Sequence, residues 1–262
     1  MNFRGGKGVR YAGGKGKCGE IAAIINNLLQ PGGVYWEPFL GSGKVMQAVR
    51  PDARRFGSDK DPHMIALLTA VQSGWDPPRE VTEEEYRKWW KVAKEGKATP
   101  MTGFCGYALS FGGQFFGGYA RDRANVTDPR QFASEGRKAL LRQRPFLEGV
   151  TIECADYRSR WVGGPTWVGG PTLIYCDPPY AGTKPVGSIK TFDSARFWRW
   201  AQRRADEGAI VLVSEYSCPL GGVKVLWEKD NKGTGGLRNK KGLAKAEKLY
   251  CLNPGVGFGL FS

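Results

Sequence analysis

The apolar positions of this chain follow two alternating periods. Apolar faces at helical spacing predict one helix over residues 21–29, ended by Pro31-Gly32, and another over 64–71. Short apolar and β-branched runs predict buried strands at 34–35, 55–59, 173–176, 210–213, 223–226 and 249–252. Strands that alternate with helices are typical of an α/β domain built on a mainly parallel sheet.

The pattern changes over residues 75–148. A capping box that starts at Thr82 opens a helix, and residues 103–119 are dominated by glycine and aromatic side chains. Neither feature continues the alternation of strands and helices. We therefore expect an insert over 75–148, within a core made of residues 1–74 and 149–262.

The most specific chemistry lies at Asp177-Pro178-Pro179-Tyr180, directly after the apolar run 173–176. Two prolines cannot continue a strand, so this tetrapeptide is expected at its carboxyl end, where open α/β sheets hold ligands. An exocyclic amine of a nucleobase offers two N–H donors. The Asp177 carboxylate and the Pro178 carbonyl can accept one each, while the Tyr180 ring stacks on the base. The tetrapeptide therefore indicates methylation of a nucleobase amine.

A glycine loop follows the first predicted strand, at residues 37–43 (Glu-Pro-Phe-Leu-Gly-Ser-Gly). Glycines at this place let the backbone approach a ligand, and the next helix is expected to turn its N-terminus toward that ligand. The loop lacks the third glycine of a dinucleotide site, and Lys44 is followed by Val45 rather than by a hydroxyl residue. An ATP-binding phosphate loop is therefore excluded.

The second predicted strand ends at Asp59, which stands about twenty residues after the glycine loop. At this spacing, nucleoside-binding sheets carry an acid that accepts hydrogen bonds from ribose hydroxyls. Asp61 is the alternative, although Asp61-Pro62 also fits the cap and first position of the next helix. We favour Asp59 for the ribose role.

These motifs, taken in order, resemble the Dam family of DNA adenine N6-methyltransferases. The resemblance spans most of the chain and rests on the segments 11–15 (Tyr-Ala-Gly-Gly-Lys), 37–43, 154–157 (Cys-Ala-Asp-Tyr), 177–180 and 213–216 (Val-Ser-Glu-Tyr), with Asp59 as the ribose acid. It implies a Rossmann-like class I methyltransferase fold, in which a mixed, mainly parallel sheet carries an inserted, mainly helical target-recognition domain with a β-hairpin. It also implies S-adenosyl-L-methionine as the cofactor and adenine N6 in DNA as the substrate.

The resemblance assigns roles to individual residues. The catalytic residues are Asp177, Pro178, Pro179 and Tyr180. The cofactor-binding residues come from the other motifs as well, and they are Tyr11, Lys15, Glu37, Pro38, Phe39, Gly41, Gly43, Asp59, Asp156, Tyr157 and Asp177. The resemblance also implies that the target adenine is flipped out of the duplex, because its N6 is inaccessible to chemistry inside the base stack.

The glycine-aromatic segment 103–119 resembles the base-reading hairpin of the family only loosely. The arginine and asparagine common near the start of that hairpin are replaced by Gly106 and Ala108. Direct readout of bases needs bidentate donors such as arginine. We therefore expect Arg121 and Arg123, just downstream, to contact DNA as base readers or as phosphate contacts.

The charge of the chain agrees with a polyanionic partner. Lysines and arginines number 39 against 25 acids, which gives a formal net charge of +14. Basic residues gather before Glu20 and again between Lys224 and Lys248, where they alternate with glycines. Loops of this composition suit a phosphate backbone, so Lys240 and Lys241 are expected to contact double-stranded DNA.

Other classes of site find little support in the sequence. The six cysteines form no Cys-x-x-Cys pair, and the single histidine, His63, has no partner for zinc or a charge relay. No secretory leader or membrane-length apolar run is present, so we expect a cytoplasmic enzyme with no membrane contact, no bound metal and no obligate protein partner. Methylation of adenine in RNA, or of cytosine N4, uses the same amine geometry and stays open. A catalytically silent nucleic-acid-binding protein is disfavoured, because binding alone requires neither Asp59 nor Asp177.

Overall fold

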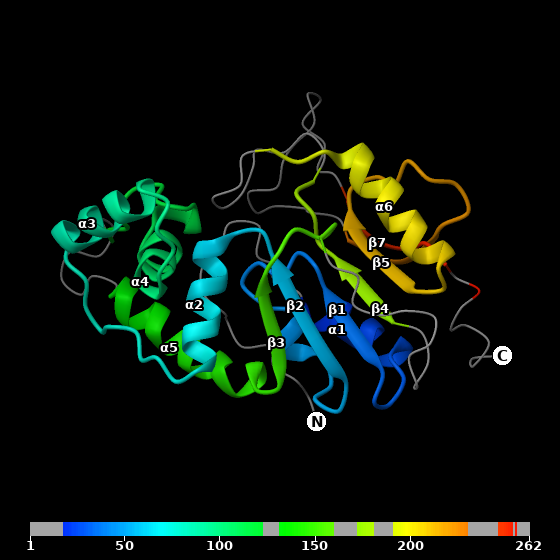
Figure 1. The fold of residues 1–262 in the computed structure, drawn as a ribbon, viewed down its shortest axis with the longest axis horizontal. Coiled ribbons are helices and arrows are strands. Elements are labelled where there is room, and N and C mark those ends of the chain that lie inside the picture. Colours follow the sequence, from blue (N-terminus) through cyan, green and yellow to red (C-terminus); the bar gives the residue numbers. More distant parts are fainter. Residues whose placement is uncertain are drawn as a thin grey trace.

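The computed structural model describes residues 18–122, 131–159, 172–180, 191–229, 246–253 and 255. These residues form a twisted sheet of seven strands with helices packed on it, and a helical lobe lies beside the sheet (Figure 1). The strands are β1 (Val34–Glu37), β2 (Arg54–Asp59), β3 (Val150–Cys154), β4 (Leu173–Cys176), β5 (Ile210–Glu215), β6 (Lys224–Lys229) and β7 (Glu247–Cys251). The α-helices are α1 (Cys18–Leu28), α2 (Pro62–Gln72), α3 (Glu83–Lys94), α4 (Pro100–Gly103), α5 (Phe132–Leu147) and α6 (Ser194–Asp206). Short helical turns cover η1 (Met46–Ala48), η2 (Phe104–Ala108) and η3 (Phe111–Gly113).

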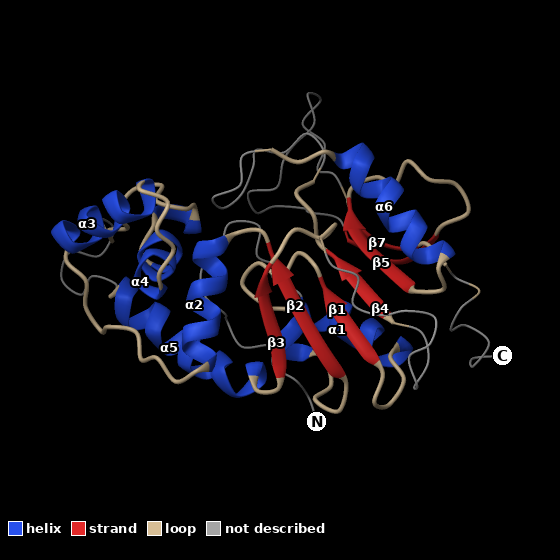
Figure 2. Ribbon diagram, viewed as in Figure 1, coloured by secondary structure: helices blue, strands red, loops and turns tan. Residues whose placement is uncertain are grey.

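The strand order of the sheet is β3-β2-β1-β4-β5-β7-β6. All neighbouring pairs from β3 to β5 are parallel, whereas β7 runs antiparallel to both β5 and β6. The order reverses between β1 and β4, and such switch points are where doubly wound sheets hold ligands. The predicted Rossmann-like architecture with its mixed, mainly parallel sheet is thus confirmed (Figure 2).

Successive side chains of the strands point to opposite faces of the sheet and pack into two separate hydrophobic cores. Tyr35 and Tyr175 belong to the cluster that α1, α2 and α5 cover, whereas Trp36 and Ile174 belong to the cluster that α6 covers. The central strands β1, β4 and β5 are buried at every position, as expected for parallel strands with both faces covered. The carboxyl ends of these strands are therefore held on a rigid frame.

Side-chain caps mark the starts of α2, α3 and α6. Asp61 caps α2 by accepting the backbone N–H groups of His63 and Met64, and Thr82 forms the expected capping box with Glu85. At α6, Asp193 is the cap and accepts the N–H of Arg196 at 2.9 Å.

The segment 103–119 does not form the two-stranded hairpin that its resemblance predicted. It makes the helical turns α4, η2 and η3, and an isolated antiparallel bridge between Ser110 and Tyr119 closes the loop. The glycines explain the difference, because they permit close helical packing rather than a hairpin turn. A Cβ atom on Gly103 would lie 2.2 Å from the backbone oxygen of His63, and one on Gly106 would lie 2.4 Å from the Phe115 ring.

Candidate active site

The glycine loop after β1 is bent back onto β2. Gly41 and Gly43 have positive φ angles of 48° and 68°, a conformation that favours glycine. The backbone N–H of Leu40 donates to the Ser58 carbonyl at 2.9 Å, and the N–H of Gly41 donates to the Asp59 carboxylate at 2.7 Å. The loop and the end of β2 therefore form one hydrogen-bonded unit.

The helix expected directly after this loop is absent from the described structure. Only the three-residue turn η1 follows Gly43, because Pro51 lies eight residues on and disfavours helical backbone before it. The loop is instead supported from α5, where the Gln143 side chain donates to the Ser42 carbonyl at 2.7 Å. The dipole of a long helix at the glycine loop is therefore not available to a ligand here.

Asp59 and Asp61 have different surroundings, although they are two residues apart. The Asp59 carboxylate accepts backbone N–H groups from Gly41 and Asp61, and burial raises its pKa to about 6. The buried Asp61 carboxylate is occupied by the cap of α2 and by the Tyr107 hydroxyl. This division supports Asp59 rather than Asp61 as the acid that faces a ligand.

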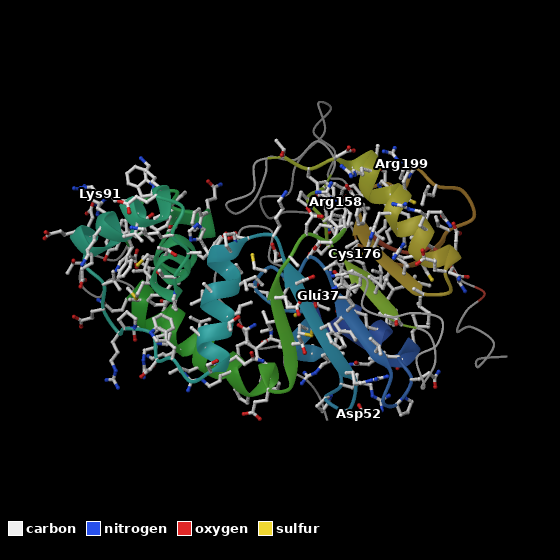
Figure 3. The ribbon with its side chains drawn as sticks, viewed as in Figure 1. Glu37, Asp52, Lys91, Arg158, Cys176 and Arg199 are labelled. Atoms are coloured by element: carbon white, nitrogen blue, oxygen red, sulfur yellow. The ribbon has the colours of Figure 1, made fainter. Side chains whose placement is uncertain are left out.

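Three acids lie near one another at the carboxyl ends of β1, β2 and β4. Glu37 is 2% exposed at the end of β1 and accepts a hydrogen bond from the Tyr35 hydroxyl at 3.0 Å. Burial raises its pKa well above the usual range, and the negative charges of Asp177 and Asp59 raise it further. No lysine or arginine of the described chain lies within ion-pair distance of Glu37 or Asp59. The three residues therefore form an acidic cluster at the carboxyl ends of β1, β2 and β4 (Glu37 is labelled in Figure 3).

The tetrapeptide after β4 has a firmly anchored aromatic ring. Pro178 is buried, while Asp177, Pro179 and Tyr180 are half-buried. The Tyr180 hydroxyl donates to Glu247 on β7 at 2.8 Å. Its ring meets the Tyr216 ring edge-on, with centroids 4.8 Å apart and an interplanar angle of 85°. Two aromatic rings thus stand beside Asp177, at the ends of β4 and β5.

Glu247 is a site residue that the sequence motifs did not reveal. It stands 67 positions from Tyr180, at the start of a strand expected only to complete the sheet. The same holds for Gln143, whose contact with the glycine loop spans 101 positions. No local pattern marks either pair, because both depend on strand or helix packing.

Aromatic residues form the rim of the site next to β3. Tyr157 is 8% exposed, and its ring packs on Phe39 of the glycine loop at 5.2 Å between centroids. Phe192 and Phe197 pack against both rings. The predicted cofactor residues Phe39 and Tyr157 are therefore brought together, with most of the Tyr157 ring covered by its neighbours.

Asp156, in the same segment, is engaged by cations. Its carboxylate accepts two hydrogen bonds from the Arg158 guanidinium, at 2.6 and 2.8 Å, and Lys60 lies 3.6 Å away. The hydrogen bonds from Arg158 lower the pKa of Asp156. Any ligand that uses this carboxylate therefore shares it with Arg158.

Arg121 lies on the helical lobe, where its guanidinium pairs with Glu83 of α3 and sits 5.9 Å from the centre of the Tyr119 ring. The other predicted contacts on or near the site, namely Tyr11, Lys15, Arg123, Lys240 and Lys241, lie outside the described residues.

Within the described part of the chain, no group of three His, Cys, Asp or Glu side chains is placed to hold a metal ion. In the same residues, no helix has both the length and the apolar character needed to cross a membrane.

Comparison with known proteins gives distant structural matches. No protein-family model matches the sequence. No curated protein matches it. A conserved hypothetical protein from Streptococcus pyogenes is 11% identical, with a TM-score of 0.35 over 89% of this chain and 93% of its own. A candidate rRNA methylase from Clostridium thermocellum is 9% identical, with a TM-score of 0.37 over 90% and 97% of the two chains. A candidate methyltransferase solved with SAH is 12% identical, with a TM-score of 0.35 over 88% of this chain and 51% of its own. At these values the matches carry no weight for chemistry or substrate, which depend on the residues of the site.

Proposed function

We propose that the protein is an S-adenosyl-L-methionine-dependent DNA methyltransferase that acts on the N6 amine of adenine. The observation that carries the proposal is the meeting of Glu37, Asp59 and Asp177 at the switch point of the sheet, beside a bent glycine loop. A cluster of acids with no described cation beside Glu37 or Asp59 suits a ligand that carries positive charge.

The donor set of the site fits this cofactor. In this proposal Asp59 accepts hydrogen bonds from the ribose hydroxyls, and the acidic cluster stabilises the sulfonium and ammonium groups. The half-buried Phe39 ring, backed by Tyr157, offers apolar surface near Asp156 for an adenine ring. S-adenosyl-L-methionine supplies the methyl group in electrophilic form, so the amine gains a methyl group and S-adenosylhomocysteine is released.

Asp177 and the Pro178 carbonyl hold the amine of the target base in this proposal. Two acceptors draw the nitrogen lone pair out of conjugation with the ring, and the reaction then requires mainly positioning. Tyr180 and Tyr216 offer rings for the base, one of which Glu247 fixes in place. The methylated nitrogen carries an extra proton, which becomes acidic only as the N–C bond forms and leaves without a strong general base.

The remaining assignments of the proposal concern the DNA. Residues 75–148 serve as the target-recognition insert on a core of 1–74 and 149–262. Arg121 and Arg123 contact the duplex near the target, and Lys240 and Lys241 contact its phosphates.

Transfer of a tritiated methyl group to DNA and to RNA, followed by nucleoside analysis, tests the proposal. We expect label in N6-methyladenine from duplex DNA. Label in RNA adenosine or in N4-methylcytosine would support the proposed amine methylation and show that the substrate is not adenine in DNA. A complete absence of transfer from a chain that binds nucleic acid would leave a silent binding protein and overturn the proposal.

A further inference from the structure

The outward face of α6 carries a stripe of arginines. The inward face of this helix is buried in the aromatic core through Phe197, Trp198, Trp200, Ala201 and Ala205. Arg196, Arg199 and Arg203 recur at spacing i, i+3 and i+7 and are all exposed. At this spacing they lie along one side of the helix.

The stripe brings like charges together on one side of α6. Like charges three or four residues apart destabilise a helix, and both neighbouring pairs in the stripe have this spacing. On α3, by contrast, Arg87 pairs with Glu83 at 2.8 Å. In the described part of the chain, no acid lies within ion-pair distance of the three stripe arginines. The acids of this face, Asp193 and Asp206, stand at its two ends, and the exposed stripe positions between them are all arginine.

The stripe begins at the rim of the active site. The inward residue Phe197 packs on Phe39 at 5.4 Å between centroids, and Trp200 packs on Tyr157 at 5.1 Å. Arg158, whose guanidinium lies 5.7 Å from the centre of the Tyr157 ring, stands at the same rim. Figure 3 shows Arg158 and Arg199 at the same end of the molecule, opposite Asp52.

We infer that Arg196, Arg199 and Arg203 form a binding surface for the phosphate backbone of the DNA that enters the active site. The inference rests on the proposed function for the identity of the nucleic acid. With a rise of about 1.5 Å per residue, the stripe spans roughly 10 Å along the helix. One strand of duplex DNA presents a phosphate every 3.4 Å along its axis, so this length matches about three phosphate intervals. The guanidinium group, with its planar fork of donors, suits phosphate oxygens.

The test compares a triple variant of the full chain with a double control variant. The stripe variant is Arg196→Gln, Arg199→Gln and Arg203→Gln, and glutamine preserves helix propensity. The control variant is Arg50→Gln and Arg54→Gln, which removes positive charge from the surface around the start of β2, outside the recognition insert. Figure 3 shows Asp52, which lies between these two arginines in the sequence, at the end of the molecule opposite Arg199. Circular dichroism and thermal unfolding check that both variants keep the wild-type fold.

Binding to a random-sequence DNA duplex is measured across a salt series, together with methyl transfer to the same duplex. We expect the stripe variant to bind about 10- to 100-fold more weakly, and its slope of log affinity against log salt to shrink by roughly two to three. The control variant should bind within about threefold of wild type, because distant charges are screened beyond roughly 10 Å.

The outcomes separate the stripe from the proposed function. Equal losses in both variants, or no loss in the stripe variant, overturn the stripe as a binding surface. A loss of binding to anionic lipid vesicles with unchanged binding to DNA overturns it as well. If the stripe variant alone loses affinity while wild type transfers no methyl group to DNA, the stripe stands and the proposed function fails.

Discussion

The acids at the ends of the inner strands β1 and β2 and the acid that follows the edge strand β3 have opposite surroundings. At the ends of β1 and β2, Glu37 and Asp59 are held by a hydroxyl and by backbone N–H groups, and burial raises the pKa of both. After β3, Asp156 is held by Arg158 and Lys60, and its pKa is lowered. All three acids follow the carboxyl ends of neighbouring parallel strands, so they lie on the same side of one sheet.

The difference indicates which of these acids contribute most to binding a cationic ligand. A carboxylate that a surface arginine already neutralises gains little from a cationic ligand. A buried carboxylate among other carboxylates gains much more, because a positive ligand relieves both burial and mutual repulsion. Glu37, Asp59 and Asp177 are therefore expected to contribute most to function, and Asp156 is expected to have a minor role.

The largest effect is expected at Asp177. Asp177→Ala should abolish methyl transfer and leave cofactor affinity within about tenfold, because the target amine loses its charged acceptor. Tritiated transfer and calorimetric binding of the cofactor measure the two quantities separately. Near-normal turnover in this variant would contradict the proposed mechanism.

Asp59 should affect the cofactor rather than the chemistry. Asp59→Ala is expected to weaken cofactor binding by about 1–3 kcal/mol, the scale of a lost charge-assisted hydrogen bond. Asp61→Asn is the matched control, since Asp61 is occupied by the α2 cap and Tyr107. Unchanged affinity in Asp59→Ala, with a loss in Asp61→Asn, would transfer the ribose role to Asp61.

The raised pKa of Asp59 adds a pH dependence with a definite sign. The ionised carboxylate accepts hydrogen bonds from ribose, and with a pKa of about 6 it takes up a proton as the pH falls through 6. Cofactor affinity should therefore be constant above this pH and fall below it by up to about tenfold per pH unit. Asp59→Asn should bind weakly and show no such dependence, as measured by titration between pH 5 and pH 8.

The sequence predicts what is local in this molecule. Asp59 and Asp177 could be placed at strand ends because apolar runs and proline breaks mark those ends within a few residues. The loop conformation of 103–119 could not be predicted, because glycine and aromatic residues suit both a hairpin and closely packed helical turns. Only the distance from Gly103 to the backbone of α2 distinguishes them. Glu247 could not be predicted at all, since its role depends on the antiparallel position of β7 beside β5.

A smaller effect on the catalytic rate is expected from the hydrogen bond between Tyr180 and Glu247 of β7. Tyr180→Phe keeps the ring and removes the hydrogen bond to Glu247, so the catalytic rate should fall by about 2- to 10-fold, the scale of one hydrogen bond. Glu247→Ala should match it, whereas Glu247→Gln keeps an acceptor and should stay near wild type. In the double variant Tyr180→Phe with Glu247→Ala, the losses should not add, because both remove the same bond. Additive losses would show that the two residues act independently.

The smallest effect is expected at Asp156. Asp156→Asn keeps an oxygen that accepts hydrogen bonds and loses only a charge that Arg158 already balances at the surface. Cofactor affinity should change by less than about 1 kcal/mol, against the larger loss from Asp59→Ala. High salt, which screens surface pairs, should reduce the small difference between Asp156→Asn and wild type and leave the effect of Asp59→Ala in place. If Asp156→Asn weakened cofactor binding as much as Asp59→Ala does, the acid after β3 would contribute as much to binding as the acid at the end of β2, and the contrast between the two regions would be wrong.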